Sequence, residues 1–163
     1  MDENDERWDA AQEGAELIAE GELPLAVKVL EQLVLAQPDN EHAYYYLGAA
    51  HYELGDYIKA LKAYVTALEL APTYVGAMVH AGHTLRMLGR YTEAIRMGQQ
   101  VLARAADDSD ALFLIGSCCF SRGDDAKAKD YLERFLHTNP ELEIATEVEG
   151  MLQVLREKLS DLN

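Results

Sequence analysis

The chain has 163 residues, 49% of them hydrophobic, a composition that suits one compact domain or a short solenoid and excludes a disordered chain. It has 14 lysines and arginines against 29 aspartates and glutamates, which gives a formal net charge of −15, and no segment is strongly basic. Because phosphate binding needs clustered cations, we expect no nucleic-acid partner. No apolar run approaches the roughly 20 residues of a membrane span, so we expect no membrane insertion.

The first six residues are acidic and lack the basic and apolar regions of an export signal, so they are expected to form an acidic tail at residues 1–6. A cytoplasmic location follows as the default expectation. The two cysteines, Cys118 and Cys119, are adjacent and make no disulfide framework. They are expected to fill space in a core rather than to react.

Three series of small residues repeat with a period of 34 residues. The first series is Gly14, Gly48, Gly82 and Gly116, the second is Gly21, Gly55, Gly89 and Gly123, and the third is Ala26, Ala60, Ala94 and Ala128. The mid-helix position of the first glycines predicts close approach of a neighbouring helix, and the second glycines suit left-handed C-caps. A fixed period of this length indicates a repeat architecture.

These residues resemble the tetratricopeptide repeat family, whose period is 34 residues. The unit at 41–74 carries the resemblance best, with Tyr44, Leu47, Gly48, Gly55, Tyr57, Ala60, Tyr64, Ala67 and Pro72. The resemblance implies an all-α fold, a right-handed superhelix of four helix–turn–helix repeats with a C-terminal capping helix. Gly98 stands where the family pattern has an aromatic residue, so looser packing is expected at that helix.

The expected organisation is the tail at 1–6, repeats at 7–40, 41–74, 75–108 and 109–142, and a capping helix at 143–163. Helices are expected near 7–20, 23–36, 41–54, 57–71, 75–88, 91–105, 109–122, 125–138 and 141–160. In the last helix, apolar residues spaced three and four apart form one face, which is expected to cover repeat four. The first repeat lacks such a cap, so fraying or a homodimer through it is expected.

The resemblance also implies a concave groove lined by the first helix of each repeat. The family's contact positions fall here on His42, Tyr45, Tyr46, Tyr52, Val79, His80, His83, Arg86, Phe113 and Phe120. Tyrosine favours binding sites because its ring is apolar and its tip is polar. The rings can instead pack between repeats or under the capping helix, and both alternatives stay open for Tyr45, Tyr52 and Phe120.

The sequence gives little indication of a metal site or of catalysis. His80 and His83, one helical turn apart, could share a metal, but no third ligand joins them, so no metal or cofactor is expected. No phosphate-binding loop or catalytic motif is present, and an enzyme is the least favoured class. His51 is expected to be a buried core residue.

We therefore expect a peptide-binding module, a small chaperone or adaptor for a protein partner. The acidic, stand-alone architecture is similar to that of bacterial chaperones of type III secretion translocators. The lysines and asparagines of a carboxylate clamp are missing at the matching positions, which excludes the family members that grip acidic C-termini of heat-shock chaperones. The alternatives are a structural adaptor subunit of a larger complex and a self-associating subunit without peptide cargo.

Overall fold

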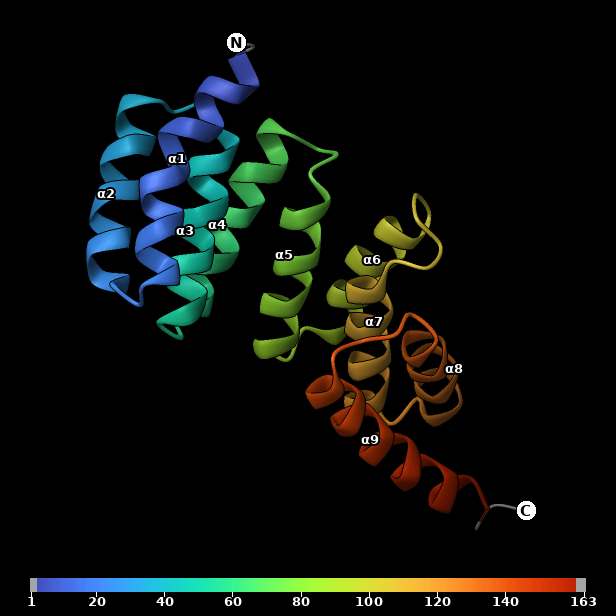
Figure 1. Cartoon of the computed structure of the whole chain (residues 1–163). Helices are drawn as coiled ribbons and strands as arrows, with labels where there is room; N and C mark the ends of the chain where they lie inside the picture. The colour runs from blue at the N-terminus through green and yellow to red at the C-terminus, as the bar shows by residue number, and fades with distance from the viewer. Residues whose placement is uncertain (1–2, 161–163) are drawn as a thin grey trace. The chain divides into compact units, whose positions relative to one another are not determined.

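The computed structural model describes residues 3–160, and every regular element within that range is an α-helix (Figure 1). The chain forms two compact units, Met1–Leu88 and Gly89–Asn163. The boundary between them falls inside the third repeat, so the two helices of that repeat belong to different units.

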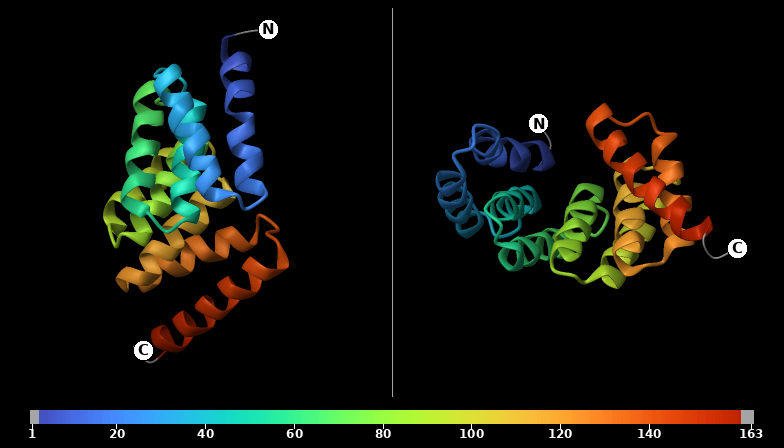
Figure 2. Two further views of the ribbon diagram at one scale, coloured as in Figure 1. Left: turned by 90° about the vertical axis from the view of Figure 1, so that its left-hand side faces the viewer. Right: turned by 90° about the horizontal axis from the view of Figure 1, so that it is seen from below.

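Unit 1 contains five helices that pack in succession (Figure 2). They are α1 (Glu3–Ala19), α2 (Leu23–Ala36), α3 (Glu41–Glu53), α4 (Tyr57–Leu70) and α5 (Val75–Met87). Helix α1 contacts both α2 and α3, while α4 lies between α3 and α5. Within this unit the first helices of the repeats, α1, α3 and α5, are the elements expected to carry a binding face.

Unit 2 contains α6 (Tyr91–Leu102), α7 (Ser109–Arg122), α8 (Asp125–Leu136) and α9 (Leu142–Ser160). Helix α7 packs against α6 and α8, and α8 packs against α9. The apolar face of α9, formed by Val148, Leu152 and Leu155, is buried in the same core cluster as Leu132 and Phe135 of α8. The last helix therefore covers the fourth repeat, as its spacing predicted.

The first helix corrects one expectation. It begins at Glu3, so residues 3–6 are helical rather than a tail ahead of the repeats, and Met1 and Asp2 lie outside the described residues. Glu3, Asp5 and Glu6 occupy its first turn, where carboxylates interact favourably with the helix dipole. The other helix ends agree with the expected ranges to within three residues.

The glycine series have the conformations that the period predicted. The second-series glycines have φ between 74° and 79°, the left-handed region in which a side chain is strained. In the first series, a Cβ added to Gly48 would lie 2.8 Å from the ring of Tyr64. The missing side chain is thus what lets α3 and α4 approach each other.

The looser packing expected at Gly98 is wrong. Gly98 is buried, and a Cβ added there would lie 2.6 Å from Cγ1 of Ile115 in α7. The isoleucine side chain therefore fills the space that an aromatic residue of α6 would otherwise occupy. A glycine on one helix is compensated by a larger residue on the next.

The start of the first repeat is joined to the loop that follows α2. The Arg7 guanidinium lies 3.2 Å from Asp39 and 3.4 Å from Glu41. Asn40, which is fully buried, donates to the backbone oxygen of Arg7 at 3.0 Å and accepts from the backbone nitrogen of Ala43 at 3.0 Å. These bonds anchor the exposed end of the solenoid, where the sequence led us to expect fraying.

Candidate protein-binding face

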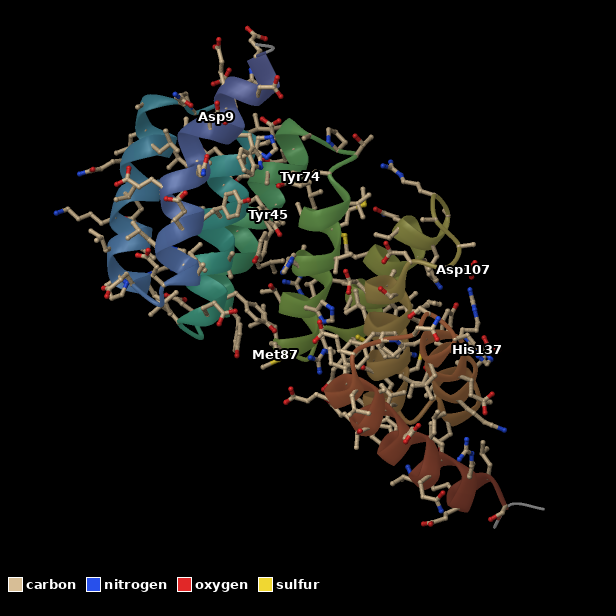
Figure 3. The ribbon with its side chains drawn as sticks, in the orientation of Figure 1. Asp9, Tyr45, Tyr74, Met87, Asp107 and His137 are labelled. Carbon is tan, nitrogen blue, oxygen red and sulfur yellow. The ribbon has the colours of Figure 1, made fainter. Side chains whose placement is uncertain are left out.

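A cluster of aromatic rings lies where α3, α4 and α5 meet in unit 1. We call it the tyrosine cluster, and its members are His42, Tyr45, Tyr46, Tyr64, Tyr74 and His80. Tyr45 is at its centre, with ring-centroid distances of 5.0 Å to Tyr46, 5.0 Å to Tyr74 and 5.5 Å to His80. Figure 3 shows Tyr45 and Tyr74 close together between α3 and α5. Edge and tilted contacts at these separations are the favourable geometries for aromatic pairs.

One ring of the cluster forms its floor. Tyr64 is fully buried, and its ring stacks on His80 at 5.8 Å. Its hydroxyl has no hydrogen-bond partner among the described residues, and burial, followed by the neighbouring Tyr45, raises its pKa. The remaining five rings are half-buried, so each presents part of its surface to solvent above this floor.

The upper end of the cluster is polar. His42 Nδ1 lies 3.3 Å from the Tyr74 hydroxyl, and His42 Nε2 lies 3.6 Å from Glu41. Burial is the largest cause that raises the pKa of Tyr74, with Tyr45 the next. Because Glu41 also contacts Arg7, a chain of polar contacts runs from α1 to the loop before α5. Such a network holds the rings in fixed positions and leaves little ordering to be done on binding.

The other end of the same helices holds Tyr52 and Arg86. Tyr52 packs edge-on to Tyr57 of α4 at 5.3 Å; burial raises its pKa and the Arg86 guanidinium opposes that shift. Arg86 Nε is buried without a hydrogen-bond acceptor among the described residues. On the same helix, burial, followed by Arg86 and His80, lowers the pKa of His83 to about 4, so this imidazole is neutral at pH 7. Val79 of α5 is buried, with 6% of its surface exposed.

The two predicted site residues of unit 2 have different surroundings. The ring of Phe113 lies 5.3 Å from Phe135 of α8, and the Lys158 ammonium of α9 lies 5.9 Å from the ring of Phe120. Both phenylalanines are half-buried against the core of α7, α8 and α9. They belong mainly to the packing of the capping helix, one of the two alternatives left open for Phe120.

Sequence reasoning did not include Tyr74 or Tyr64 among the site residues. Tyr74 occupies the N-cap position of α5, where the equivalent residues 34 positions away are Asn40 and Asp108. Those two side chains cap their helices, while the tyrosine makes no capping bond. A residue unsuited to capping at a capping position is a signal that its side chain is used elsewhere.

The surroundings of the histidines and cysteines suit packing rather than chemistry. Within residues 3–160, no group of three histidine, cysteine, aspartate or glutamate side chains is placed to hold a metal ion. His51 is 7% exposed, and both cysteines are buried, as expected. Burial raises the pKa of the Cys119 thiol, which makes the thiolate scarce at neutral pH.

Comparison with known proteins identifies the family. Two family models described as tetratricopeptide repeat match residues 42–74 and 85–146, which together are more than half of the chain. The chain belongs to the tetratricopeptide repeat family. The repeats of this family are scaffolds for protein–protein interaction, and the chain is a module of that kind.

The curated relatives are much longer proteins. The chain is 28% identical over 137 residues to human superkiller complex protein 3 and 30% identical over 137 residues to the mouse protein of that name. Each alignment covers 80% of this chain and 9% of the relative, so the chain spans about a tenth of the length of these proteins.

Solved structures share the fold at low identity. MamA from Desulfovibrio magneticus RS-1 matches with a TM-score of 0.78 and 19% identity, covering 99% of this chain and 94% of that one. YrrB, described as a tetratricopeptide-repeat protein with an unusual peptide-binding site, matches with a TM-score of 0.71 and 19% identity, covering 88% and 74%. No helix in the described part of this chain is both long enough and apolar enough to cross a membrane.

Proposed function

We propose that the chain binds a segment of a partner polypeptide on the tyrosine cluster of unit 1, as a small cytoplasmic chaperone or adaptor. The observation that carries the proposal is the packing around Tyr45, whose ring has four aromatic neighbours and remains partly exposed. Partly exposed rings set on a buried floor form a rigid apolar surface with polar edges. Surfaces of this composition are typical of binding hot spots.

Different residues of the tyrosine cluster make different kinds of contact with the bound segment. The faces of Tyr45 and Tyr46 bury apolar side chains of the bound segment, while the hydroxyl of Tyr74 and the imidazoles of His42 and His80 offer hydrogen bonds to its backbone. At the far end of the face, the Arg86 guanidinium is available for a carbonyl or carboxylate oxygen of the segment. His83 and Tyr52 lie along the route between these two ends, and the buried Val79 supports them from below.

The charge of unit 1 favours a basic partner. Residues 1–88 contain 5 lysines and arginines against 15 aspartates and glutamates. Helix α1 contributes much of this charge, and it packs directly against α3. An acidic wall beside aromatic faces attracts cationic segments at long range and can stack their side chains on the rings at short range.

The experiment that tests the proposal is a binding titration with matched variants. Peptides that bind the immobilised full chain are selected by display, and the best is titrated calorimetrically against the wild type, Tyr45→Ala and Leu35→Ala. Leu35 is an apolar residue of α2 that is 83% exposed, so its replacement controls for the loss of a large apolar side chain. We expect Tyr45→Ala to weaken binding by at least about tenfold and Leu35→Ala to leave it unchanged. Equal affinity for all three proteins would reject the tyrosine cluster as the binding site.

Chaperone and adaptor roles are separated by co-expression. A chaperone keeps its partner soluble when the two are produced together, and the effect is lost with Tyr45→Ala. An adaptor binds the same segment without changing the solubility of the partner.

A second candidate function is self-association through the first repeat. It is favoured by Trp8 of α1, the single tryptophan of the chain, which is 44% exposed. Light scattering of the wild type and of Trp8→Ala tests it, because a dimer held through this face would dissociate in the variant. A wild type that is monomeric at high micromolar concentration would remove this candidate.

A further inference from the structure

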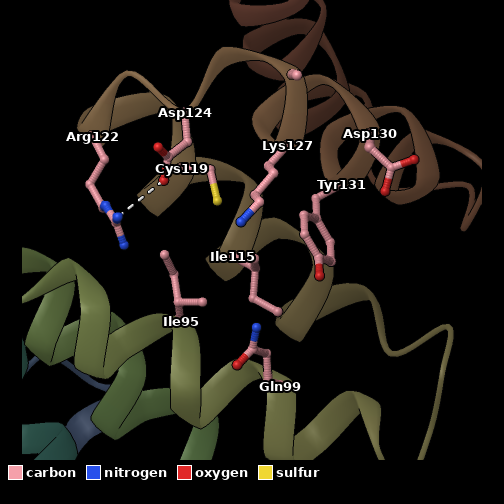
Figure 4. A pocket seen from close by; sticks show the side chains of 10 residues that line it. Ile95, Gln99, Ile115, Cys119, Arg122, Asp124, Lys127, Asp130 and Tyr131 are labelled. Carbon is pink, nitrogen blue, oxygen red and sulfur yellow. Dashed lines mark ion pairs between the residues drawn. The ribbon is translucent and has the colours of Figure 1, made fainter.

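A cleft of about 400 Å³ opens on unit 2 between α6 and α8, on the side of the second helices of the repeats (Figure 4). Its floor is apolar and is formed by Ile95 of α6 together with Ile115 and Cys119 of α7. The volume falls within the range of roughly 300–1,000 Å³ that is usual for ligand pockets. None of the ten residues that line the cleft is among the predicted residues of the binding face.

The repeat builds an equivalent cleft in unit 1, of about 300 Å³, over α3. Leu47, His51 and Lys59 line it, and each stands 68 residues, or two repeats, before Ile115, Cys119 and Lys127 of the cleft in unit 2. The shape is therefore a product of the fold, and differences in side chains between the two clefts show what is particular to the cleft in unit 2.

The two clefts differ in the state of the lysine at this shared position, and unit 1 has a further lysine, Lys62, where unit 2 has Asp130. In unit 1, Lys59 pairs with Asp56 at 3.2 Å. In unit 2 the equivalent aspartate, Asp124, pairs instead with Arg122 at 3.3 Å, and Lys127 makes no ion pair with any described residue. A leucine, Leu54, stands in unit 1 where Arg122 stands in unit 2, so Asp56 has no arginine at that position to pair with.

Unlike Lys127, the carboxylates of the cleft are paired with cations. Asp130 lies 3.8 Å from Arg134, so the carboxylates at the rim each have a cation of their own. Figure 4 shows Lys127 directed over the floor toward Ile115 and Cys119, with the Gln99 amide and the Tyr131 hydroxyl at its edges. In unit 1 the positions of Gln99 and Tyr131 hold Glu31 and Ala63, which supply a negative charge and no hydroxyl. The cleft in unit 2 thus combines an apolar floor with one uncompensated cation and two neutral polar groups.

We propose that this cleft binds the C-terminal residue of a partner polypeptide whose last side chain is apolar. The side chain lies on Ile95, which keeps exposed surface beside the fully buried Ile115, and the terminal carboxylate accepts hydrogen bonds from the Lys127 ammonium and the Gln99 amide. A chain terminus carries an apolar side chain and a carboxylate on the same residue, which an internal segment does not. Although the chain is acidic overall, its distant carboxylates are screened beyond roughly 8 Å at physiological ionic strength. The two carboxylates that line the cleft, Asp124 and Asp130, pair with Arg122 and Arg134, which leaves Lys127 as the unpaired charge of the cleft.

The probe is an acetylated pentapeptide that ends in two leucines and has a free carboxylate, compared with the same peptide as its C-terminal amide and with octanoate. Binding to the full chain is followed by NMR through the backbone amide signals of α6, α7 and α8. The variants are Lys127→Gln, which removes the charge at constant length, and Lys129→Gln, a control on the same helix whose lysine pairs with Glu133 at 3.9 Å. A third variant, Arg122→Leu, recreates the arrangement of unit 1 and frees Asp124 to pair with Lys127.

We expect saturable shifts with the free acid, at a dissociation constant on the order of 0.1–1 mM for so short a peptide. The amide, Lys127→Gln and Arg122→Leu each weaken binding about five- to tenfold, and Lys129→Gln has no effect. The proposal is overturned if no saturable shifts occur up to about 10 mM, if acid and amide bind equally, or if Lys127→Gln keeps full affinity. Octanoate that binds more tightly than the peptide would overturn the peptide terminus as the ligand.

Discussion

The substitution Gly48→Ala adds a single Cβ atom that affects the stability of the fold in two opposite ways. Alanine is the better helix former, and the exchange in the interior of α3 would by itself stabilise the fold by about 1 kcal/mol. The added Cβ, however, would lie 2.8 Å from two ring atoms of Tyr64, closer than such contacts allow. Tyr64 is fully buried between α3 and the rest of the tyrosine cluster, so its ring cannot move aside without displacing Tyr45 or His80.

Overpacking of this kind costs about 1–3 kcal/mol, and the crowded ring places Gly48→Ala in the upper part of that range. After subtraction of the helix term, we expect a net destabilisation of about 1–2 kcal/mol. The matched control is Gly150→Ala in α9, where an added Cβ would meet no atom within 4 Å, so only the helix term remains. That variant should be more stable than the wild type by about 0.5–1 kcal/mol.

The assay is urea unfolding of the full chain, followed by circular dichroism and by the fluorescence of Trp8, which reports on unit 1. A double-mutant cycle with Tyr64→Val isolates the clash, because valine lacks the ring atoms that the new Cβ would meet. In that background Gly48→Ala should become neutral or stabilising, which corresponds to a coupling energy of about 2 kcal/mol. A coupling energy near zero would refute the reasoning, since the cost would then arise from something other than the Tyr64 ring.

Two further predictions concern the stability of unit 1. Asn40→Ala removes a helix cap and two further hydrogen bonds of a fully buried side chain, and should destabilise by about 2–3 kcal/mol. Asp108→Ala, which removes one capping bond to Ala111, should cost about 1 kcal/mol in the same urea titration; equal losses would contradict the role of the extra bonds. Burial, opposed by Asp56, lowers the pKa of His51 below its usual 6.5, so protonation favours the unfolded state. Stability from this group is complete above pH 6.5 and falls as the pH drops below it, and His51→Gln should flatten the decline of the urea midpoint between pH 6.5 and 5. An unchanged pH dependence in that variant would show that other groups cause the decline.

Much of the fold could be predicted because its signals are local and repeated. Each left-handed glycine ends a first helix, and Gly14, Gly48 and Gly116 each lie against a large side chain of the following helix, so the period alone sets the helix boundaries. The start of α1 was missed, since an acidic run reads as a tail when nothing apolar precedes it. The packing at Gly98 was missed because the compensating residue, Ile115, lies in a different repeat.

The candidate site was predictable only in part. Family positions identified Tyr45, His80 and their neighbours on α3 and α5, but not which of these rings meet. Which rings meet depends on the angles between the helices, and these angles cannot be read from a short stretch of sequence. Tyr74 was missed because it lies before α5 and not on it, although its place among capping residues marked it as unusual. Lys127 is unpaired because Asp124 pairs with Arg122 instead, and this pairing can be read only from the three-dimensional structure.

The most direct test of the binding face is site-specific photo-crosslinking with a selected peptide. A benzophenone amino acid replaces Tyr46 in one variant and Leu35 in another, and the crosslinked product is measured by mass spectrometry after illumination. We expect the peptide to be captured from position 46, next to Tyr45, and not from position 35 on α2, whose leucine is 83% exposed. Capture from position 35 with none from position 46 would contradict the assignment of the binding face to the tyrosine cluster.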